Sequence, residues 1–411
     1  MLYDENINLE CVLRHRTIQT HFQPIVSIRK QGVIGLEALS RGVSPDNAII
    51  MPQTLFIEAA TTGRSVELDR LCREKALETF KSISAQGSDS FLFLNLNTSI
   101  LDEGVVGSGY LIKAVNQLGL RPTSIVIEVI ESKVRDIDSL TRFIKLHKQY
   151  GFLIALDDMG SDSSNLDRIL QVRPDIIKID RGLIKDISND YYKQELFKAL
   201  VFVAKKTGAL IIAEGVETHN EAVTCLELGA DFLQGYYIAY PAPFTNNLHR
   251  VISKKMHLLS FSYRSSMVKK IQNMSSARNF YNDILEAVKE KLSCIYPEHF
   301  EMKLDEIAKY QTCVQCFYLL DSNGMQITDT IKSYVNDDDG IRHRMFHPDC
   351  KGSDQSLKEY YLYIHSGFES YISEPYISLA NGHPCVTGSI IFQAYNGTHY
   401  ILCIDFDLLK S

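Results

Sequence analysis

Short apolar runs alternate with longer, partly polar stretches between about residues 20 and 240. Most runs are hydrophobic at consecutive positions, which is typical of strands buried on both faces of a parallel sheet. The runs are 33–39, 91–97, 125–130, 153–158, 176–180, 210–216 and 231–237. The stretches between them fit helices, since 138–151 and 193–208 both end in a glycine. This pattern predicts repeated βα units.

The spacing of the repeats indicates how the sheet closes. From Glu37 to Gln234 the units recur about every 33 residues. Right-handed βα units in this number favour an α/β fold of the TIM type, a (β/α)8 barrel of about 250 residues. An open doubly wound sheet is the alternative, but no glycine-rich dinucleotide-binding loop follows any early strand.

The pattern changes twice after Pro243. Residues 246–292 form a predicted helical linker whose lysines 254, 255, 269 and 270 we interpret as a solvated helix face. Residues 293–411 then show the short strands and turns of a separate α+β domain. Its predicted strands are 314–321, 325–331, 370–378, 385–392 and 399–408, with a helix at 356–367 and hairpin turns at 322–324 and 396–398. We therefore expect a barrel over 1–245, a linker over 246–292 and a second domain over 293–411.

Seven polar residues of the barrel region share one feature: each lies within or at the end of an apolar strand. They are Glu37, Asn95, Glu128, Asp157, Asp158, Asp180 and Glu214. Strand ends meet at the active-site face of such a barrel, and clustered carboxylates there would repel one another unless cations neutralised them. Oxygen ligands favour Mg²⁺, Mn²⁺ or Ca²⁺ over zinc. The adjacent Asp157 and Asp158 could serve two ions, an arrangement that recurs in phosphodiester cleavage.

Eight ordered blocks identify the family that the chain resembles. They are 22-FQPIV-26, 37-EALSR-41, 94-LNLN-97, 127-IEVIES-132, 156-LDDMG-160, 174-PDIIKID-180, 213-AEGVET-218 and 234-QGYY-237. Over about residues 15 to 245 the chain resembles the EAL-type cyclic di-GMP phosphodiesterases. The resemblance implies hydrolysis of one 3′,5′ bond of cyclic di-GMP to linear pGpG, dependent on Mg²⁺ or Mn²⁺ and inhibited by Ca²⁺.

The resemblance also implies a role for each matched residue. Implied ligands of the first metal are Glu37, Asn95, Glu128 and Asp157, of which Asp157 also bridges to a second metal held by Asp158. Lys178 matches the lysine that touches the water or a metal, and Glu214 matches a general base or second-metal ligand. With Glu37, these two are the expected catalytic residues. The expected substrate-binding residues are Gln23, Arg41, Asp180 and Gln234.

The chain departs from the family pattern at two places. Ile130 stands where the family usually has threonine, and residues 159–165 differ in the loop that positions the second metal and contributes to a homodimer. The glutamate that stabilises this loop matches Glu131, which is present. The alternative is therefore a catalytically inactive cyclic di-GMP receptor that signals through its C-terminal domain. A scaffold that no longer binds the nucleotide is disfavoured by Arg41 and Gln234.

Two features of the C-terminal region bear on function. The run 374–389 resembles PAS/Cache-like sensor modules, which implies regulation by an unknown ligand. Cys313, Cys316, His347 and Cys350 include metal-binding residue types. Cys313 and Cys316, however, abut or lie in one strand, where residues three apart point to opposite faces, so we disfavour zinc.

Composition narrows the class of protein. The formal net charge of -7, from 43 Lys+Arg and 50 Asp+Glu, argues against a nucleic-acid polymer as partner. No apolar run reaches the roughly 18 residues of a membrane span, so we expect no membrane insertion. The N-terminus lacks the pattern of a secretory signal, and nine scattered cysteines in a long chain suggest reduced thiols. We expect a cytoplasmic protein.

Overall fold

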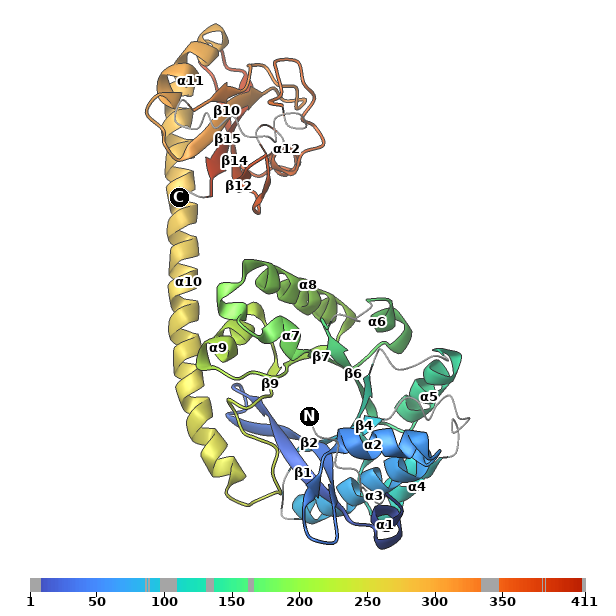
Figure 1. Ribbon diagram of the computed structural model, residues 1–411. Coiled ribbons are helices and arrows are strands. Elements are labelled where there is room, and N and C mark those ends of the chain that lie inside the picture. Colours follow the sequence, from blue (N-terminus) through green and yellow to red (C-terminus); the bar gives the residue numbers. More distant parts are fainter. Residues whose placement is uncertain are drawn as a thin grey trace. The chain divides into compact units, whose positions relative to one another are not determined.

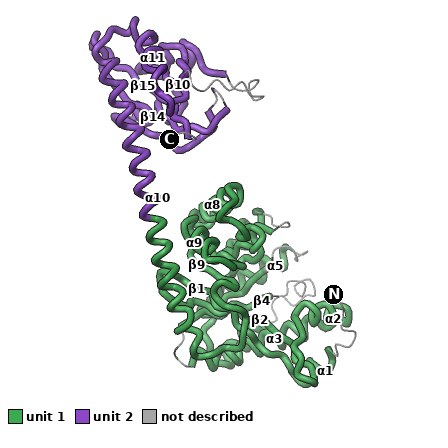
Figure 2. The backbone as a smooth tube through the Cα atoms, turned by 60° about the vertical axis from the view of Figure 1, so that its left-hand side comes forward, with its two compact units in different colours: residues 1–267 green, residues 268–411 purple. Residues whose placement is uncertain are grey.

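The chain forms two units whose boundary lies inside one long helix, α10 (Leu248–Ser293). Figure 2 colours the units, residues 1–267 and 268–411. The structure is a computed structural model. It describes residues 9–85, 87, 89–96, 109–130, 137–161, 166–333, 347–378, 380 and 382–408.

A closed barrel of strands forms the first unit (Figure 1). Its sheet has the order β1-β9-β8-β7-β6-β5-β4-β2-β3, and an additional β1–β2 pairing closes the ring. The strands are β1 (Ile18–Ser27), β2 (Gly32–Val43), β3 (Ile49–Ile50), β4 (Phe91–Leu96), β5 (Ile125–Ile130), β6 (Leu153–Met159), β7 (Ile176–Ile179), β8 (Leu210–Ala213) and β9 (Phe232–Leu233). From β2 through β4 to β9, neighbouring strands are parallel. The predicted TIM-type barrel is confirmed.

Strand β1 differs from the repeated parallel units that the sequence pattern predicts. It pairs antiparallel with both β2 and β9. Only residues 28–31 connect it to β2, and so short a link permits an antiparallel hairpin but no parallel crossover. The polar His21 and Gln23 and the following Pro24 interrupt its apolar pattern, which is why periodicity alone did not reveal it.

Helices pack around the outside of the barrel. They are α1 (Leu9–His15), α2 (Pro52–Thr61), α3 (Ser65–Ser84), α4 (Tyr110–Gln117), α5 (Ile137–Gln149), α6 (Asp167–Val172), α7 (Arg181–Ile184), α8 (Tyr191–Thr207) and α9 (His219–Leu228). Short 3₁₀ turns lie at Pro122–Ser124 and Ile187–Asn189. The predicted helical stretches 138–151 and 193–208 correspond to α5 and α8, and α8 is followed by Gly208 in the left-handed conformation, φ 80°. A glycine adopts this conformation without the steric cost of a Cβ atom.

The second unit is an α+β domain, as predicted. Its sheet has the order β11-β10-β15-β14-β12, with β13 paired to β14. The elements are a 3₁₀ turn (Pro297–His299), α11 (Phe300–Ala308), β10 (Val314–Leu320), β11 (Ile331–Lys332), α12 (Glu359–His365), β12 (Ser370–Ile372), β13 (Tyr376–Ile377), β14 (Pro384–Gln393) and β15 (His399–Asp407). The hairpin at 396–398 joins β14 to β15, which confirms that turn.

The strand predicted at 325–331 is wrong for most of its length. Only β11 pairs regularly with β10, while Gln326 makes an isolated bridge to Leu320. Next to the turn a backbone bond remains, since the Ile327 amide donates to the Leu319 carbonyl at 2.8 Å. Beyond it side chains make the bonds: Thr328 Oγ1 accepts from the Leu319 amide at 3.1 Å, and Gln326 Nε2 donates to the Thr328 carbonyl at 3.0 Å. Such local side-chain bonds compete with regular strand pairing.

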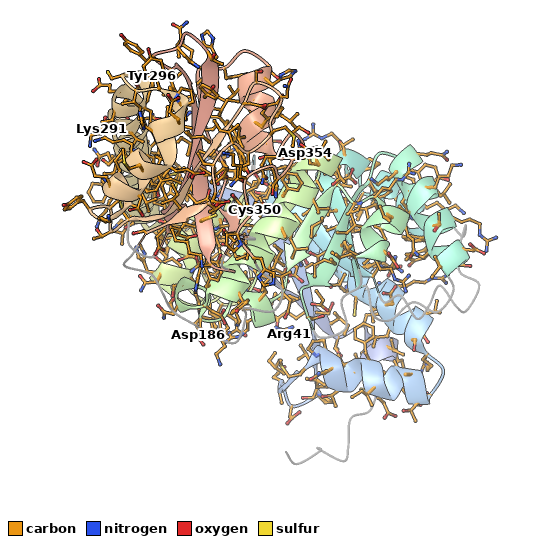
Figure 3. All side chains as sticks on the ribbon, turned by 90° about the horizontal axis from the view of Figure 1, so that it is seen from above. Arg41, Asp186, Lys291, Tyr296, Cys350 and Asp354 are labelled. Carbon is orange, nitrogen blue, oxygen red and sulfur yellow. The ribbon has the colours of Figure 1, made fainter. Side chains whose placement is uncertain are left out.

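Two further expectations concern the described residues as a whole. Cys313 and Cys316 are buried, whereas Cys350, labelled in Figure 3, is exposed. Among the described residues, every cluster able to hold a metal lies in the barrel, so the C-terminal cysteines form no such cluster. No helix in the described part of the chain combines the length and apolar character needed to cross a bilayer.

Candidate functional site

The alternation of side chains along the strands places the site above an apolar floor. The floor inside the barrel consists of Ile25, Phe93, Val126, Ala155, Ile176 and Ile212. Two positions from these residues stand, in the same order, Gln23, Asn95, Glu128, Asp157, Lys178 and Glu214. Residues two apart share one face of a strand, so each polar residue also faces the barrel interior. The sequence thus builds floor and site in adjacent layers.

Glu37 reaches the same layer because of a glycine. It stands two positions after Gly35, where a Cβ atom would lie only 2.5 Å from the Phe93 ring. The absence of a side chain at Gly35 lets Phe93 complete the floor. Asn95 Nδ2 donates to Glu37 Oε1 at 2.8 Å, which leaves the amide oxygen of Asn95 available as a ligand.

Asp157 and Asp158 are consecutive, yet both line the same cavity. The pairing of β6 with β7 is irregular between Leu156 and Met159, and Asp158 has a positive φ of 60°. An irregularity of this kind adds a residue to one strand and redirects the side chains beside it. The two carboxylates can therefore face one site from neighbouring positions.

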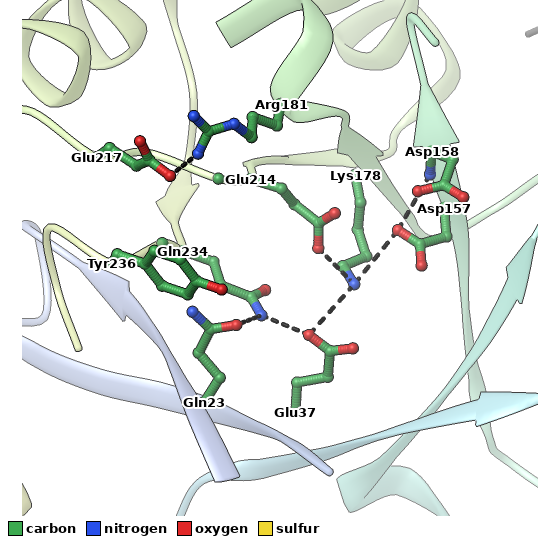
Figure 4. Close-up of a pocket in the computed structure, with 12 residues that line it drawn as sticks. Gln23, Glu37, Asp157, Asp158, Lys178, Arg181, Glu214, Glu217, Gln234 and Tyr236 are labelled. Carbon is green, nitrogen blue, oxygen red and sulfur yellow. Dashed lines mark hydrogen bonds and ion pairs between the residues drawn. The ribbon is translucent and has the colours of Figure 1, made fainter. Parts of the chain in front are cut away.

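A single ammonium group lies at the centre of the site. Lys178 is 1% exposed, and its Nζ lies 2.5 Å from Glu128 Oε1 and 2.5 Å from Glu214 Oε1. Asp157 Oδ1 and Glu37 Oε2 are 3.3 Å and 3.8 Å away. Four carboxylates thus surround one positive charge, which leaves an excess of negative charge. Figure 4 shows three of them, Glu37, Asp157 and Glu214, around Lys178.

The pKa directions follow from this crowding. Burial, and after it the charge of Glu37, raises the pKa of Glu128 well above its ordinary value. Burial and then Asp157 do the same to the pKa of Glu214. Burial opposes the charge of Lys178, but the surrounding carboxylates outweigh it and raise the pKa of Lys178. Without further cations, the site can hold its carboxylates together only at an electrostatic cost.

The donor set fits divalent cations. Ligand oxygens of Glu37, Glu128 and Glu214 lie within 4.8 Å of one another, and so do those of Asp157, Asp158 and Glu214. Neither carboxylate oxygen of the fully buried Glu128 accepts a hydrogen bond of good geometry from a described residue. An all-oxygen set of buried carboxylates, in excess over the one ammonium of Lys178, suits hard ions such as Mg²⁺, Mn²⁺ or Ca²⁺.

A cavity of about 320 Å³ opens above these residues. Gln23 and Gln234 line it, and Gln234 Nε2 donates to Gln23 Oε1 at 3.2 Å and also to Glu37. The sequence reasoning missed five further lining residues, Arg181, Gly215, Glu217, Gly235 and Tyr236. Glu217 and Tyr236 lie inside two of the sequence blocks quoted above, and Arg181 directly follows a third, so proximity to these blocks was the available signal.

Asn95 and Glu128 do not line this cavity themselves, but they contact Glu37 and Lys178, which do. Three other predicted residues are not part of the lining either. Arg41, on β2, donates to the Ser40 carbonyl at 2.9 Å and lies within electrostatic range of Glu37 and Tyr236. Asp180 caps α7, because its Oδ1 accepts from the Gly182 amide at 2.7 Å. Glu131 lies outside the described residues.

Comparison with known proteins agrees with this geometry. Residues 7–241 match the model of the EAL domain. The chain belongs to the EAL domain family. It is 26% identical to the EAL-domain containing protein YkuI of Bacillus subtilis over 351 residues, which cover 83% of this chain and 82% of YkuI. It is also 28% identical to the cyclic di-GMP phosphodiesterase PdeR of Escherichia coli. That match spans 237 residues and covers 57% of this chain and 36% of PdeR.

Solved structures extend the comparison. A crystal structure of YkuI in complex with substrate c-di-GMP and calcium matches with a TM-score of 0.80 at 24% identity, and covers 98% of this chain and 99% of that one. This likeness shows that the EAL chain shares the fold. Klebsiella pneumoniae BlrP1, in c-di-GMP complexes with calcium or with manganese, matches at a TM-score of 0.51 and 28% identity. These matches cover 55% of this chain and 56% of BlrP1.

Proposed function

We propose that this EAL protein is a metal-dependent phosphodiesterase that hydrolyses cyclic di-GMP to linear pGpG. The observation that carries the proposal is the clustering of four carboxylates around Lys178, those of Glu37, Glu128, Asp157 and Glu214. An oxygen of Asp158 also lies within 4.8 Å of oxygens of Asp157 and Glu214. A carboxylate set of this density suits two cations, and paired cations are a recurring device for cleaving phosphodiesters. A relative named as a cyclic di-GMP phosphodiesterase, and a similar structure solved in complex with c-di-GMP, support the choice of substrate.

The roles of the residues follow from their positions. We propose that Glu37, Asn95, Glu128 and Asp157 would hold the first cation. Asp157 would also hold the second cation, together with Asp158. Bound there, Mg²⁺ or Mn²⁺ would supply an activated water and neutralise charge on the phosphodiester.

The remaining residues act on the proton and on the substrate. Glu214 accepts a proton from the attacking water, and Lys178 holds Glu214 in place through their 2.5 Å ion pair. Gln23 and Gln234 orient the nucleotide from the cavity wall. Arg41 contacts a phosphate oxygen, for which a guanidinium is suited.

The test is conversion of cyclic di-GMP by the purified full chain, with products separated by chromatography. We expect pGpG with Mg²⁺ or Mn²⁺, none with a chelator, and inhibition by Ca²⁺, which is larger and less strict in geometry. Nucleotide that binds in a calorimetric titration but is not converted would instead identify a receptor. A protein that neither binds nor converts cyclic di-GMP would refute both functions.

We further propose a context for this activity. The second unit acts as a regulatory domain for a ligand that is still unknown, and two copies of the chain form a homodimer through the loop around Ser161. The proposed compartment is the cytoplasm, where the nine free cysteines would stay reduced. Mass in solution and turnover of truncated chains test the first two points.

A further inference from the structure

One wall of the cavity is a short backbone segment, residues 234–238, that follows β9. Its Gln234 and Tyr236 line the cavity. The segment is hydrogen-bonded to the strand end that carries Glu214: the Tyr237 amide donates to the Val216 carbonyl at 3.0 Å, and the Val216 amide donates to the Gln234 carbonyl at 3.0 Å. A Cβ atom at Gly235 would lie 2.1 Å from Val216 O, so the two backbones lie too close together for any residue other than glycine at this position.

Helix α10 holds the segment from outside the barrel. Lys255 Nζ donates to the Tyr237 carbonyl at 2.7 Å and to the Ile238 carbonyl at 3.0 Å. The same ammonium lies 5.6 Å from the centre of the Tyr237 ring. Hydrogen bonds from a charged donor are among the stronger ones in proteins. Lys255 therefore does not belong to a purely solvated helix face.

A second connection runs through His219, the first residue of α9. Its Nδ1 is 2.8 Å from the Tyr237 hydroxyl, and its Nε2 is 3.0 Å from Ser262 Oγ on α10. The side chain of Tyr237 is thus linked to α10 through His219, while its backbone is linked through Lys255. Both links end on the residue next to Tyr236.

Apolar packing keeps this part of α10 in place. Ile252, Met256 and Leu259 are fully buried in the barrel's core cluster. The neighbouring Lys254 is exposed, on another face of the helix. Lys254 and Lys255 thus offer two adjacent lysines of which one contacts the cavity wall.

We propose that Lys255 is a positioning residue for the nucleotide site, and that α10 fixes the placement of Gln234 and Tyr236 through it. The inference rests on the proposed function for the identity of the nucleotide, but the contact itself can be tested without nucleotide. Removing the ammonium leaves the Tyr237 and Ile238 carbonyls without their charged donor. The segment can then shift, and the cavity wall becomes less well ordered for binding.

The experiment compares Lys255→Met with Lys255→Arg, which keeps the charge, and with the matched control Lys254→Met, all in the full chain. Hydrogen exchange of the nucleotide-free proteins is measured first. The amides of Tyr237, Ile238 and Ala239 are hydrogen-bonded within the segment or to Val216 and report on it directly. In Lys255→Met we expect their exchange to quicken about tenfold, the scale set by loss of a charge-assisted bond. Exchange in β5 should not change.

Binding is measured next, by calorimetry with cyclic di-GMP and Ca²⁺ and by titration with Mn²⁺ alone. Lys255→Met should raise the Kd for the nucleotide about tenfold and leave the Kd for Mn²⁺ within about twofold. Lys255→Arg should recover most of the nucleotide affinity, and Lys254→Met should resemble the unaltered protein.

The inference is overturned if exchange of the segment is unchanged in Lys255→Met, or if Lys254→Met has the same effect. It is also overturned if an unaltered protein that binds the nucleotide loses no affinity on the Lys255→Met change. A protein that binds no cyclic di-GMP in any form would refute the proposed function, while the exchange measurement would still decide the contact of Lys255.

Discussion

The ammonium group of Lys178 compensates the buried negative charge of the site. Among the described side chains, no other positive charge lies as close to these carboxylates. Glu128 is fully buried and lies 2.5 Å from it. Removing one partner of a buried ion pair costs about 3–5 kcal/mol, because the other charge remains buried and uncompensated. Lys178→Met should therefore lower the free energy of unfolding by about this amount in the presence of a chelator.

The same variant should respond more strongly to metal than the unaltered protein. A bound cation replaces part of the lost positive charge, and a ligand that binds only the folded state stabilises it. Urea unfolding with a chelator and with Mg²⁺ measures both effects. Lys198→Met, at an exposed lysine paired with Glu195, is the control. An equal loss of stability in both conditions would contradict the charge argument.

Glu37 and Glu214 belong to the cluster for different reasons, and both should be essential for turnover. Glu37→Ala removes a proposed ligand, and Glu214→Gln removes the proposed proton acceptor. Residues that merely support metal ligands contribute about 10- to 100-fold, so each change should reduce the rate by at least about a hundredfold. Product chromatography measures the rate, and circular dichroism checks that the fold is retained. A variant with unaltered rate would show that its role is assigned wrongly.

At the scale of elements, the sheet of the second unit has two unlike faces. One face of its central strands is apolar and packs against α10 and α11. On the other face a row runs across β10, β15 and β14 through Cys316, Asp405 and Thr387, which are register partners. Thr387 Oγ1 donates to Asp405 Oδ1 at 2.7 Å, and the Cys316 thiol donates to Oδ2 at 3.4 Å. The carboxyl group of Asp405 is thus held by neutral donors.

This row predicts a pH dependence of stability. Burial raises the pKa of Asp405 above its ordinary value, and the donors around it and the more distant Lys358 only partly offset this. The other ionisable neighbours are Cys385, Cys403, Tyr318, Tyr360 and Tyr376, all with raised pKa values. The folded state therefore keeps the proton of Asp405 to higher pH than the unfolded state does. Stability should fall as pH rises above about 4, by up to about 1.4 kcal/mol per pH unit, until the folded pKa is passed.

Asp405→Asn should remove this fall, because asparagine does not ionise. Pulsed hydrogen exchange of β15 peptides across a urea series, at pH 5 and pH 8, reads the stability of this sheet. Asp283→Asn, at an exposed position of the same unit, should leave the pH dependence as it is. An unaltered pH dependence in Asp405→Asn would show that another group is responsible.

Sequence pattern revealed those elements whose own residues determine them. The apolar runs of β4 to β8 and the helix α8 with its terminal glycine were all predictable from local sequence. Strand β1 was not, since polar residues such as Gln23 interrupt its apolar pattern, and its partner β9 is distant in sequence. The same limit applies to the stretch 325–331, where side-chain bonds of Gln326 and Thr328 accompany only partial strand pairing with β10.

The candidate site was largely visible in sequence for a related reason. Residues such as Glu128 and Lys178 are charged groups inside apolar strands, and this contrast can be read directly. Tyr236 carries no such contrast, because a tyrosine after a strand is unremarkable until the closing β1–β9 contact places it at the cavity. Asp180 is also a carboxylate at a strand end, and its Oδ1 caps α7; its predicted role in substrate binding stays a prediction.

At the scale of the whole molecule, α10 has residues in the cores of both units. Ile252, Met256 and Leu259 belong to the cluster of the barrel, whereas Leu285 and Leu292 belong to the cluster of the C-terminal sheet. The sequence predicts a linker that begins at residue 246, while contacts place the boundary of the first unit after Met267. The N-terminal part of α10 therefore completes the barrel, in addition to any role in joining the units.

This arrangement predicts different behaviour for two truncated chains. Residues 1–267 should fold with the stability of the barrel in the full protein, whereas residues 1–245 should be destabilised. The shorter chain exposes the surface that Ile252, Met256 and Leu259 cover, and each fully buried side chain of this size contributes about 1.5–3 kcal/mol. The loss should reach at least about 4 kcal/mol, and it should include weaker nucleotide binding because the Lys255 contact is also removed.

Thermal unfolding and turnover of the two truncated chains and the full protein, measured side by side, test this prediction. A Tm for 1–245 equal to that for 1–267 would show that α10 contributes nothing to the barrel. The comparison of 1–267 with the full chain separately reports on the second unit. A changed rate supports control by the C-terminal domain. If 1–267 is a monomer, the full chain is a dimer and the rate is unchanged, the domain acts only in assembly. Because 1–267 retains the Lys255 contact, a rate difference between it and the full chain cannot be attributed to a disrupted cavity wall.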